Sequence, residues 1–223
     1  MSKTYLLTGG TGFLGSLLSI ELIKKGDKVI FMGRAKNNES FSSRIIKTIK
    51  SIEPEISLDN IEIIEIDLCV DNFIENFKDK LKNKIDGIWH LAANLSFREK
   101  DRQEIFSTNI GGLKNILNFA TFIKSPVFYV STAYVHGQRP GIIYERDLIK
   151  PKYFNNPYEE SKFEGEKIIK KWGEKEENKY IVFRPSILIE KERKTLSYFG
   201  YYAVVHSLYK MKKKMGDKPL KIF

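Results

Sequence analysis

The stretch TYLLTGGTGFLGSLL, which runs from Thr4 to Leu18, decides the fold of this chain. It begins as a short apolar run, crosses four glycines within seven residues, and continues as an apolar helical pattern. Glycine destabilises both strands and helices, so a cluster of glycines where a strand leads into a helix needs a physical reason. The spacing of Gly9, Gly12 and Gly15 suits a tight turn, a close approach of the backbone to a pyrophosphate, and close packing of helix against strand, in that order. The sequence therefore predicts a dinucleotide-binding loop at this point.

The rest of the chain alternates between apolar, β-branched runs and segments with helical periodicity. Strands of this kind, alternating with helices, indicate a parallel sheet that is covered on both faces and joined by right-handed crossovers. We therefore predict an α/β Rossmann-like, doubly wound fold that binds its ligand at the carboxyl ends of the strands. The predicted strands are Thr4–Thr8, Lys28–Met32, Ile61–Ile66, Gly87–Leu91, Val127–Ser131 and Tyr180–Arg184. The predicted helices are Phe13–Lys25, Phe41–Ile52, Asp71–Leu81, Arg102–Ile123, Pro157–Trp172 and Thr195–Met215.

The composition argues against several classes of protein. The 223 residues, of which 42% are hydrophobic, can bury one substantial core. The single cysteine, Cys69, excludes a disulfide framework and a cysteine-rich metal site, and we predict no metal site. No signal-like segment precedes the first predicted strand, and no apolar run reaches the roughly 18 residues that a membrane-spanning helix needs. We therefore expect a soluble cytoplasmic protein without integral membrane association.

The formal net charge of +10 raises the question of nucleic-acid binding. The lysines are spread along helix faces and mixed with glutamates, as in KKWGEKEENK at Lys170–Lys179. Such a face is usually only a solvated one, so we predict no nucleic-acid partner. A basic surface would instead suit a phosphate-bearing ligand. The sequence leaves the oligomeric state open, a dimer included.

The end of the second predicted strand indicates which dinucleotide the loop prefers. In KVIFMGRAK, at Lys28–Lys36, Gly33 occupies the place where a carboxylate would bond a ribose 2′-hydroxyl, and Arg34 follows it. An acid there would repel a 2′-phosphate, whereas an arginine can pair with it through charge-assisted hydrogen bonds. We therefore expect NADP(H) to be preferred over NAD(H).

A second motif, NPYEESKFEGE at Asn156–Glu166, carries candidate catalytic groups. Tyr158 and Lys162 are four residues apart, so on a helix they lie on one face, one turn apart. A phenol has an ordinary pKa of about 10, and a neighbouring ammonium stabilises the phenolate. Tyr158 could then protonate a carbonyl-derived oxygen as hydride arrives, or deprotonate an alcohol in the reverse direction.

Together with several shorter motifs, these features resemble the extended type of short-chain dehydrogenase/reductase over roughly residues 3 to 190. The motifs are Thr8-Gly9-x-x-Gly12-x-x-Gly15, Asp67-Leu68, HLAA at His90–Ala93, NIGG at Asn109–Gly112, STA at Ser131–Ala133, Tyr158-x-x-x-Lys162, and RPS at Arg184–Ser186. Within that type, the closest likeness is to the thioester-reductase and fatty acyl-CoA reductase branch. It is carried by TGGTGFLGSLL, HLAANLSF, YEESKFEGE, and GRAK with Arg44 ten residues after Arg34.

The resemblance implies a role for each matching residue. Thr132 would polarise the substrate carbonyl, Tyr158 would be the acid/base, and Lys162 would lower the pKa of Tyr158 and bind the nicotinamide ribose. Asn109, also in the catalytic set, would kink the central helix and hold a proton-relay water. The residues expected to bind the cofactor are Gly9, Thr11, Gly12, Phe13, Leu14, Gly15, Arg34, Arg44, Asp67, Leu68, Ala92, Ala93, Asn94, Tyr158, Lys162, Pro185 and Ser186.

The resemblance also implies a domain division and a reaction. Residues 1–190 would form the NAD(P)-binding domain, and residues 191–223 would begin an incomplete C-terminal substrate-binding region, because extended members run well beyond this length. The implied function is an NADP(H)-dependent oxidoreductase acting on an acyl thioester or related carbonyl, borne by a phosphate-bearing small molecule or a carrier protein. Two alternatives remain. One is an NAD(P)-dependent nucleotide-sugar epimerase or dehydratase. The other is a non-catalytic NADP-binding sensor, which the intact acid/base set disfavours.

Overall fold

The computed structural model describes residues 2–77, 84–175, 178–189 and 201–215 of the chain. The chain divides into two units, Met1–Pro185 and Ser186–Phe223. The second unit contains the helix α7 (Tyr201–Met215), whose last turn carries three lysines, a favourable placement for positive charge at a helix C-terminus. Within the described ranges, no helix is both long enough and apolar enough to cross a membrane.

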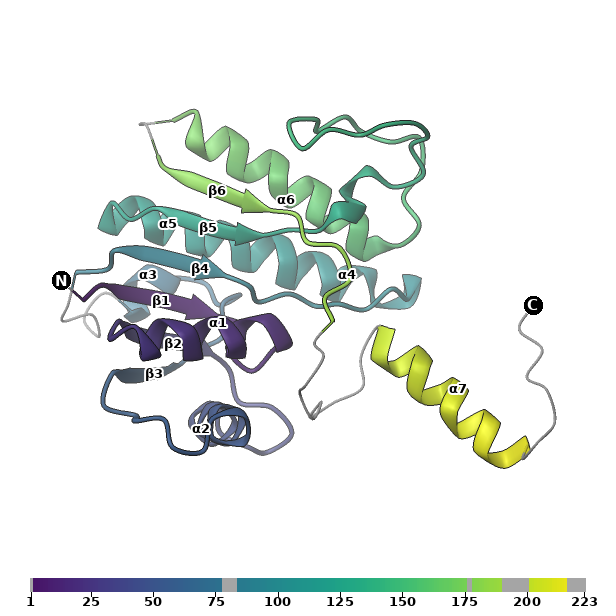
Figure 1. Ribbon diagram of the computed structural model, residues 1–223. Coiled ribbons are helices and arrows are strands. Elements are labelled where there is room, and N and C mark those ends of the chain that lie inside the picture. Colours follow the sequence, from purple (N-terminus) through teal and green to yellow (C-terminus); the bar gives the residue numbers. More distant parts are fainter. Residues whose placement is uncertain (1, 78–83, 176–177, 190–200, 216–223) are drawn as a thin grey trace. The chain divides into compact units, whose positions relative to one another are not determined.

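The first unit is built on one sheet of six parallel strands in the order β3-β2-β1-β4-β5-β6 (Figure 1). This confirms the predicted doubly wound fold. The direction of strand addition reverses between β1 and β4, so the carboxyl ends of these two strands form the switch point where such folds bind ligands. The strands are β1 (Thr4–Thr8), β2 (Lys28–Gly33), β3 (Ile61–Glu65), β4 (Gly87–His90), β5 (Val127–Val130) and β6 (Tyr180–Phe183).

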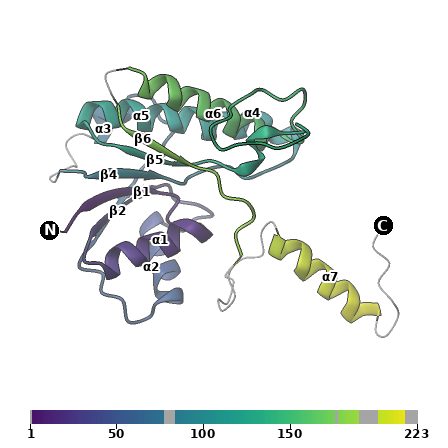
Figure 2. The same cartoon turned by 45° about the horizontal axis from the view of Figure 1, so that its top comes forward.

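Helices cover both faces of the sheet, as Figure 2 shows. Two of them, α1 and α2, lie on one face, and α3 to α6 lie on the other. Right-handed crossovers produce this division, because the chain first winds from β1 towards β3 and then from β4 towards β6. The helices are α1 (Phe13–Lys24), α2 (Phe41–Ile52), α3 (Phe73–Phe77), α4 (Arg102–Phe106), α5 (Gly112–Ile123) and α6 (Pro157–Gly173).

The predicted helix boundaries need two kinds of correction. The segment predicted as one helix at Arg102–Ile123 is α4, a π-helical turn η3 (Ser107–Gly111), and α5. The interruption contains Asn109, the residue at which a kink of the central helix was predicted; the structure has a π-helical turn there. Helix α3 begins at Phe73 rather than at Asp71. The predicted end at Leu81, and residues 195–200 of the last predicted helix, lie outside the described residues.

Five of the predicted strand ends are off by one residue. Four strands stop one residue early, because the residue after each already belongs to the loop that follows: Ile66, Leu91, Ser131 and Arg184. The second strand instead includes Gly33, which pairs with Glu65 of β3. Side chains important for the site therefore leave the sheet just beyond its carboxyl edge.

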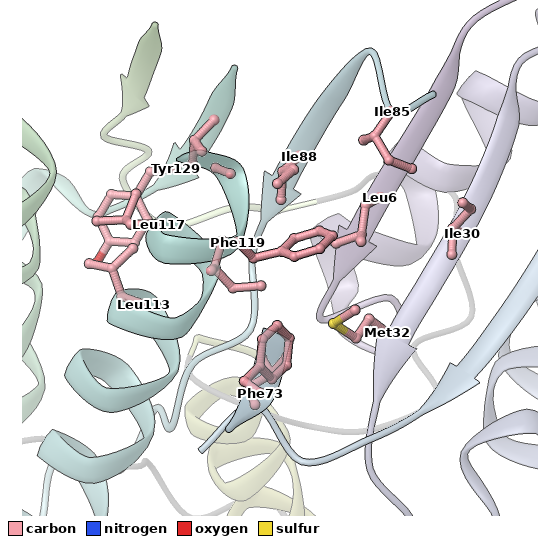
Figure 3. Close-up of a cluster of buried hydrophobic side chains, with 14 of the residues drawn as sticks. Leu6, Ile30, Met32, Phe73, Ile85, Ile88, Leu113, Leu117, Phe119 and Tyr129 are labelled. Carbon is pink, nitrogen blue, oxygen red and sulfur yellow. The ribbon is translucent and has the colours of Figure 1, made fainter. Parts of the chain in front are cut away.

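Two buried clusters hold the layers together. Successive residues of a strand point to opposite faces, so Leu6 packs under α5 while its neighbour Leu7 packs under α1 and α2. Figure 3 shows the first cluster, in which Phe119 of α5 lies against Leu6 and against Phe73 of α3. Burying such side chains stabilises the fold by about 1.5–3 kcal/mol each. The carboxyl edge of the sheet is thereby supported from both sides.

Candidate active site

The glycine-rich loop follows β1 at the switch point, where its glycines are required by close contacts. Gly9 has a φ of +78°, and a Cβ atom there would lie 2.7 Å from the amide nitrogen of Ala92. The Gly12 N–H donates to the Gly9 carbonyl at 2.9 Å and closes the turn. A side chain on Gly15 would collide with that same carbonyl oxygen. Gly15 thus allows α1 to pack closely against the backbone that directly follows β1.

The loop leaves the amino end of α1 open to an anion. Gly12 is the N-cap residue and provides no side-chain hydrogen bond to the first turn of this 12-residue helix. The first N–H groups of a helix have no partner within the helix, and the helix dipole makes this end positive. A pyrophosphate fits both features, so the chain's residues suit the predicted dinucleotide. Phe13 and Leu14 lie half-buried in this first turn.

Two further glycines are needed for packing, a role that the sequence did not reveal. A Cβ atom on Gly10 would come within 2.7 Å of the Phe31 ring. A Cβ atom on Gly33 would lie 2.6 Å from the ring of Phe41, at the start of α2. A side chain at residue 33 would require this buried ring to shift. The packing of Phe41 therefore disfavours a carboxylate at this position.

Basic groups gather beside the loop at the ends of β1, β2 and β3. Arg44 of α2 donates through Nη1 to the Arg34 carbonyl at 2.9 Å and through Nη2 to the Thr11 hydroxyl at 3.2 Å. Arg34 donates to the Asp67 carboxylate at 3.0 Å. The structure thus brings together all four of these predicted cofactor residues, and the Arg34 side chain remains 58% exposed.

The charge of Asp67 is stabilised within this group. Burial alone would raise the pKa of its carboxyl, but hydrogen bonds from the Cys69 N–H and from Arg34 outweigh burial and lower the pKa. Leu68, also predicted to bind the cofactor, is 9% exposed and packs in the first core cluster. Its contact with a cofactor would therefore have to come from the backbone.

At the end of β4, a buried hydrogen-bonded pair, Thr8 and His90, connects β1 to β4. The Thr8 hydroxyl accepts the N–H groups of Leu91 and Ala92 at 3.2 and 3.1 Å. Its single hydrogen is then free to donate to Nδ1 of His90 at 2.9 Å. Burial, followed by the nearby Lys162 charge, lowers the pKa of His90 to about 3, so the ring is neutral. The sequence motif containing His90 did not indicate this contact, because Thr8 lies 82 residues away.

Asn109 connects the segment after β4 to α6. Its Oδ1 accepts the Asn94 N–H at 2.7 Å, and its amide donates to the Asn94 carbonyl at 3.1 Å and to the Ser161 hydroxyl at 2.8 Å. The residue is 2% exposed. Both amide hydrogens are used within the protein, so this side chain positions Asn94 and α6 rather than donating to a relay water. Its place in the catalytic set stays a prediction.

Helix α6 begins where strong start signals coincide. The Asn156 side chain accepts the Glu159 N–H at 2.9 Å, and Pro157 occupies the first turn, where a missing N–H costs nothing. This cap fixes Tyr158 in the first turn of the helix. Its ring lies 5.8 Å, centroid to centroid, from the ring of Phe97, a residue of the HLAANLSF motif that was not predicted to belong to the site.

Lys162 lies one turn after Tyr158 and reaches β5. Its ammonium donates to the Val130 carbonyl at 2.8 Å, and Nζ lies 4.8 Å from the centroid of the Tyr129 ring and 6.0 Å from that of Tyr158. Thr132 follows β5 and is 5% exposed. Its hydroxyl oxygen accepts the Tyr134 N–H at 3.2 Å, which leaves the hydroxyl hydrogen available as a donor.

Burial controls the ionisation of the tyrosine and the lysine. It raises the pKa of Tyr158 to about 12, with a further contribution from Glu159. It lowers the pKa of Lys162 to about 7, against the attraction of Glu166. The expected lowering of the Tyr158 pKa by Lys162 is therefore absent from the protein alone, because desolvation disfavours both charged forms.

The remaining predicted residues lie as follows. Ala92 and Ala93 are half-buried after β4, and the Pro185 carbonyl accepts the N–H of Ala133, next to Thr132, at 3.0 Å. Ser186 belongs to the second unit. Across the described residues, no group of three or more histidine, cysteine or carboxylate side chains could hold a metal ion.

A family model described as male sterility protein matches residues 7–217 of the chain. The UDP-N-acetyl-alpha-D-glucosaminuronate decarboxylase of Bacillus cytotoxicus is 32% identical over 145 residues, covering 62% of this chain and 39% of that protein. Fatty acyl-CoA reductase 8 of Arabidopsis thaliana is 27% identical over 177 residues, covering 69% of this chain and 35% of that protein.

Among solved structures, a thiolation-reductase di-domain from an archaeal non-ribosomal peptide synthetase matches with a TM-score of 0.72. The two are 27% identical, and the match covers 83% of this chain and 41% of that chain. This chain therefore spans less than half the length of each of these three proteins. The likeness agrees with the Rossmann-like sheet described above.

Proposed function

The chain belongs to the male sterility protein family, and with it to the extended short-chain dehydrogenases/reductases. We therefore propose that it is an NADP(H)-dependent reductase of acyl thioesters or related carbonyl compounds. The observation that carries the proposal is the presence of two separate groups along one sheet edge. One group, around Arg34 and Arg44, suits a phosphate-bearing cofactor. The other contains Thr132, Tyr158 and Lys162, which suit proton transfer and carbonyl polarisation.

Cofactor preference is supported by the ends of β1 and β2. Arg44 is held by two hydrogen bonds, to Thr11 and to the Arg34 carbonyl, so its guanidinium is positioned before any ligand arrives. A carboxylate at residue 33 is disfavoured, because its Cβ atom would meet the buried Phe41 ring. A 2′-phosphate bound there would therefore lie near two arginines, with Asp67 already paired with Arg34. These features favour NADP(H) over NAD(H).

The bound cofactor would supply hydride to the carbonyl carbon of the substrate. Tyr158, whose pKa of about 12 keeps it protonated at neutral pH, would donate its phenolic proton to the carbonyl oxygen. The Thr132 hydroxyl would donate a hydrogen bond to that oxygen as negative charge develops. For a thioester the product is a hemithioacetal. Breaking its C–S bond, with the hydroxyl proton passing to sulfur, yields an aldehyde and a thiol.

The substrate class rests on the relatives and on charge. A fatty acyl-CoA reductase and a thiolation-reductase di-domain are both named for thioester-linked chemistry. The net charge of +10 would attract a substrate borne on coenzyme A or on a phosphopantetheine carrier protein, and salt would weaken that attraction. We propose carrier-borne or coenzyme-A-borne acyl thioesters as substrates, in the cytoplasm.

A nucleotide-sugar enzyme is the second candidate. It is favoured by the 32% identity with a UDP-sugar decarboxylase. The same tyrosine and lysine could then remove a proton from a sugar hydroxyl as hydride leaves for the cofactor. The packing of Phe41, which disfavours a carboxylate at residue 33, weighs against this candidate. A non-catalytic sensor is less favoured, because binding alone requires neither Tyr158 nor Thr132.

The test is an assay of NADPH oxidation and aldehyde release with acyl-CoA and acyl-carrier-protein thioesters, using the natural full-length protein with any residues that follow Phe223. Tyr158→Phe should cut turnover at least about a hundredfold while NADPH still binds. Tyr144→Phe, at a 56% exposed tyrosine, is the matched control and should leave turnover unchanged. Failure with both thioesters, together with conversion of a UDP-sugar, would establish the second candidate instead.

A further inference from the structure

A buried ion pair lies directly behind the candidate catalytic groups. Glu166 of α6 is 3% exposed, and Arg184 follows the last residue of β6. The Arg184 guanidinium donates through Nε to both carboxylate oxygens of Glu166, at 2.9 and 3.1 Å, and through Nη2 to one of them at 2.6 Å. Side-chain exposures of 14% and 4% place this pair well inside the protein. Figure 1 shows α6 running alongside β5 and β6.

The arginine also holds the segment that carries Thr132. Its Nη1 donates to the Glu145 carbonyl at 2.8 Å and lies 3.4 Å from Nε2 of His136. Since an arginine can only donate, His136 accepts through Nε2. His136 ends the short 3-10 helix η4 (Ala133–His136), which Thr132 caps. One guanidinium thus connects α6, the end of β6 and the turn that begins at Thr132.

The carboxylate stands on the same helix face as the tyrosine and the lysine. Tyr158, Lys162 and Glu166 are spaced four residues apart, so each lies one turn after the last. Lys162 is 3% exposed, and its ammonium has a single hydrogen-bond acceptor, the Val130 carbonyl, among its contacts in the described part of the chain. A buried cation with one neutral acceptor needs a compensating charge nearby. Glu166, one turn after Lys162, is the buried carboxylate whose charge acts on this ammonium. Glu159, three residues before Lys162, instead accepts hydrogen bonds from Asn155 and Asn156.

We propose that Glu166 and Arg184 are a positioning pair: Glu166 balances the charge of Lys162 from within α6, and Arg184 ties that carboxylate to the Thr132 turn. The pair therefore sets both the protonation of the lysine and the distance between the two halves of the site. The proposal uses the proposed function only for the importance of a charged Lys162. Neither residue needs to touch substrate or cofactor.

The other titratable groups that interact with Lys162 do not supply the missing negative charge. Tyr129 of β5 and His90 of β4 are buried and neutral, because burial raises the pKa of Tyr129 and lowers that of His90 to about 3. Tyr158 on α6 holds its proton, with a pKa of about 12. Removing the Glu166 charge should therefore lower the pKa of Lys162 further.

The experiment measures the pKa of Lys162 directly, by NMR titration of the side-chain 15N resonance in the full chain, assigned with Lys162→Gln. Glu166→Gln keeps the size of the side chain and removes its charge. It should lower the pKa of Lys162 by at least about one unit, the size expected for a charge one helical turn away. Glu164→Gln, on the same helix but paired with Lys167, is the control and should leave that pKa unchanged.

Two additional measurements keep the outcome decisive if Glu166→Gln does not fold. In the unmodified protein, the Glu166 carboxyl 13C chemical shift should change with pH, and the midpoint of that change should equal the pKa measured for the Lys162 nitrogen. In Glu166→Asp, which keeps the charge, the Lys162 pKa should stay within about half a unit of the unmodified value. A folded Glu166→Gln with an unchanged Lys162 pKa, or a Glu166 resonance insensitive to Lys162, would overturn the proposal. These readouts require no turnover, so they stand even if thioester reduction fails.

Discussion

The two arginines beside the glycine-rich loop should contribute unequally to NADPH binding. Arg44 is half-buried and already oriented by Thr11 and by the Arg34 carbonyl, so little side-chain entropy is lost when it meets a phosphate. Arg34 is 58% exposed and is paired with Asp67, so binding a phosphate means sharing an existing ion pair. We therefore expect Arg44→Ala to be the more damaging substitution.

The contacts of each arginine set the expected loss of NADPH affinity when it is replaced by alanine. A hydrogen bond to a charged group contributes about 1.5–3 kcal/mol when it is partly buried. Arg44→Ala should therefore weaken NADPH binding roughly tenfold or more. An exposed ion pair contributes only about 0.2–1 kcal/mol, so Arg34→Ala should weaken NADPH binding by a factor of about five or less. Affinity for NADH, which lacks the 2′-phosphate, should change less than twofold in both variants.

Calorimetric titration of each variant with NADPH and NADH measures these differences. Lys47→Ala removes an exposed positive charge from the same helix, α2, and is the matched control for long-range electrostatics. Raising the salt concentration should affect the control and both arginine variants alike. If NADPH and NADH bind the unmodified protein equally, or if Arg44→Ala weakens both cofactors to the same extent, the assignment of this group to a 2′-phosphate is wrong.

Three further predictions concern stability. Gly33→Ala should lower the free energy of unfolding, measured in urea, by about 1–3 kcal/mol, because its Cβ atom would lie 2.6 Å from the Phe41 ring. Gly111→Ala, whose Cβ atom would have nothing within 4 Å, is the control and should be neutral or stabilising. Equal effects of the two substitutions would contradict the packing argument. Asn109→Ala should lower the free energy of unfolding by about 2 kcal/mol, because it leaves the buried hydrogen-bonding partners of Asn109 unpaired. A change below about 0.5 kcal/mol would show that Asn109 does not hold these segments together. Burial lowers the pKa of Lys162 from 10.5 to about 7. Below pH 7 the buried charge therefore destabilises the folded state, by at most about 5 kcal/mol, and this penalty disappears as the pH rises from 7 to 10.5. Lys162→Met should therefore raise the unfolding free energy more at pH 6 than at pH 10, and a pH-independent difference would refute the burial of a charge there.

Local sequence patterns were sufficient to predict the alternation of strands and helices. Strand and helix periodicity are written in consecutive residues, so β1 to β6 were found within one residue at each end. The glycine spacing and the four-residue step from Tyr158 to Lys162 are equally local. They allowed the family, the dinucleotide loop and the acid/base helix to be predicted without coordinates.

Contacts between distant segments could not be read in this way. Arg44 reaches Thr11 across 33 residues, and Thr8 meets His90 across 82. The reason for glycine at residue 33 is the Phe41 ring, which only the folding of α2 onto β2 brings into place. A sequence pattern specifies which residue stands at a position, but the neighbours that restrict it come from other elements.

Ionisation states depended most strongly on tertiary structure. From the sequence, a lysine one turn from Tyr158 was expected to lower the pKa of the phenol; in the folded protein, burial raises it to about 12 and lowers that of Lys162 to about 7. Desolvation depends on every element packed around a group, and no local spacing encodes it. The sequence by itself therefore determined the fold and the identity of the candidate groups. The tertiary structure decided their charges, and it brought Glu166 and Arg184 together behind them, because burial and long-range pairing arise only when the layers close.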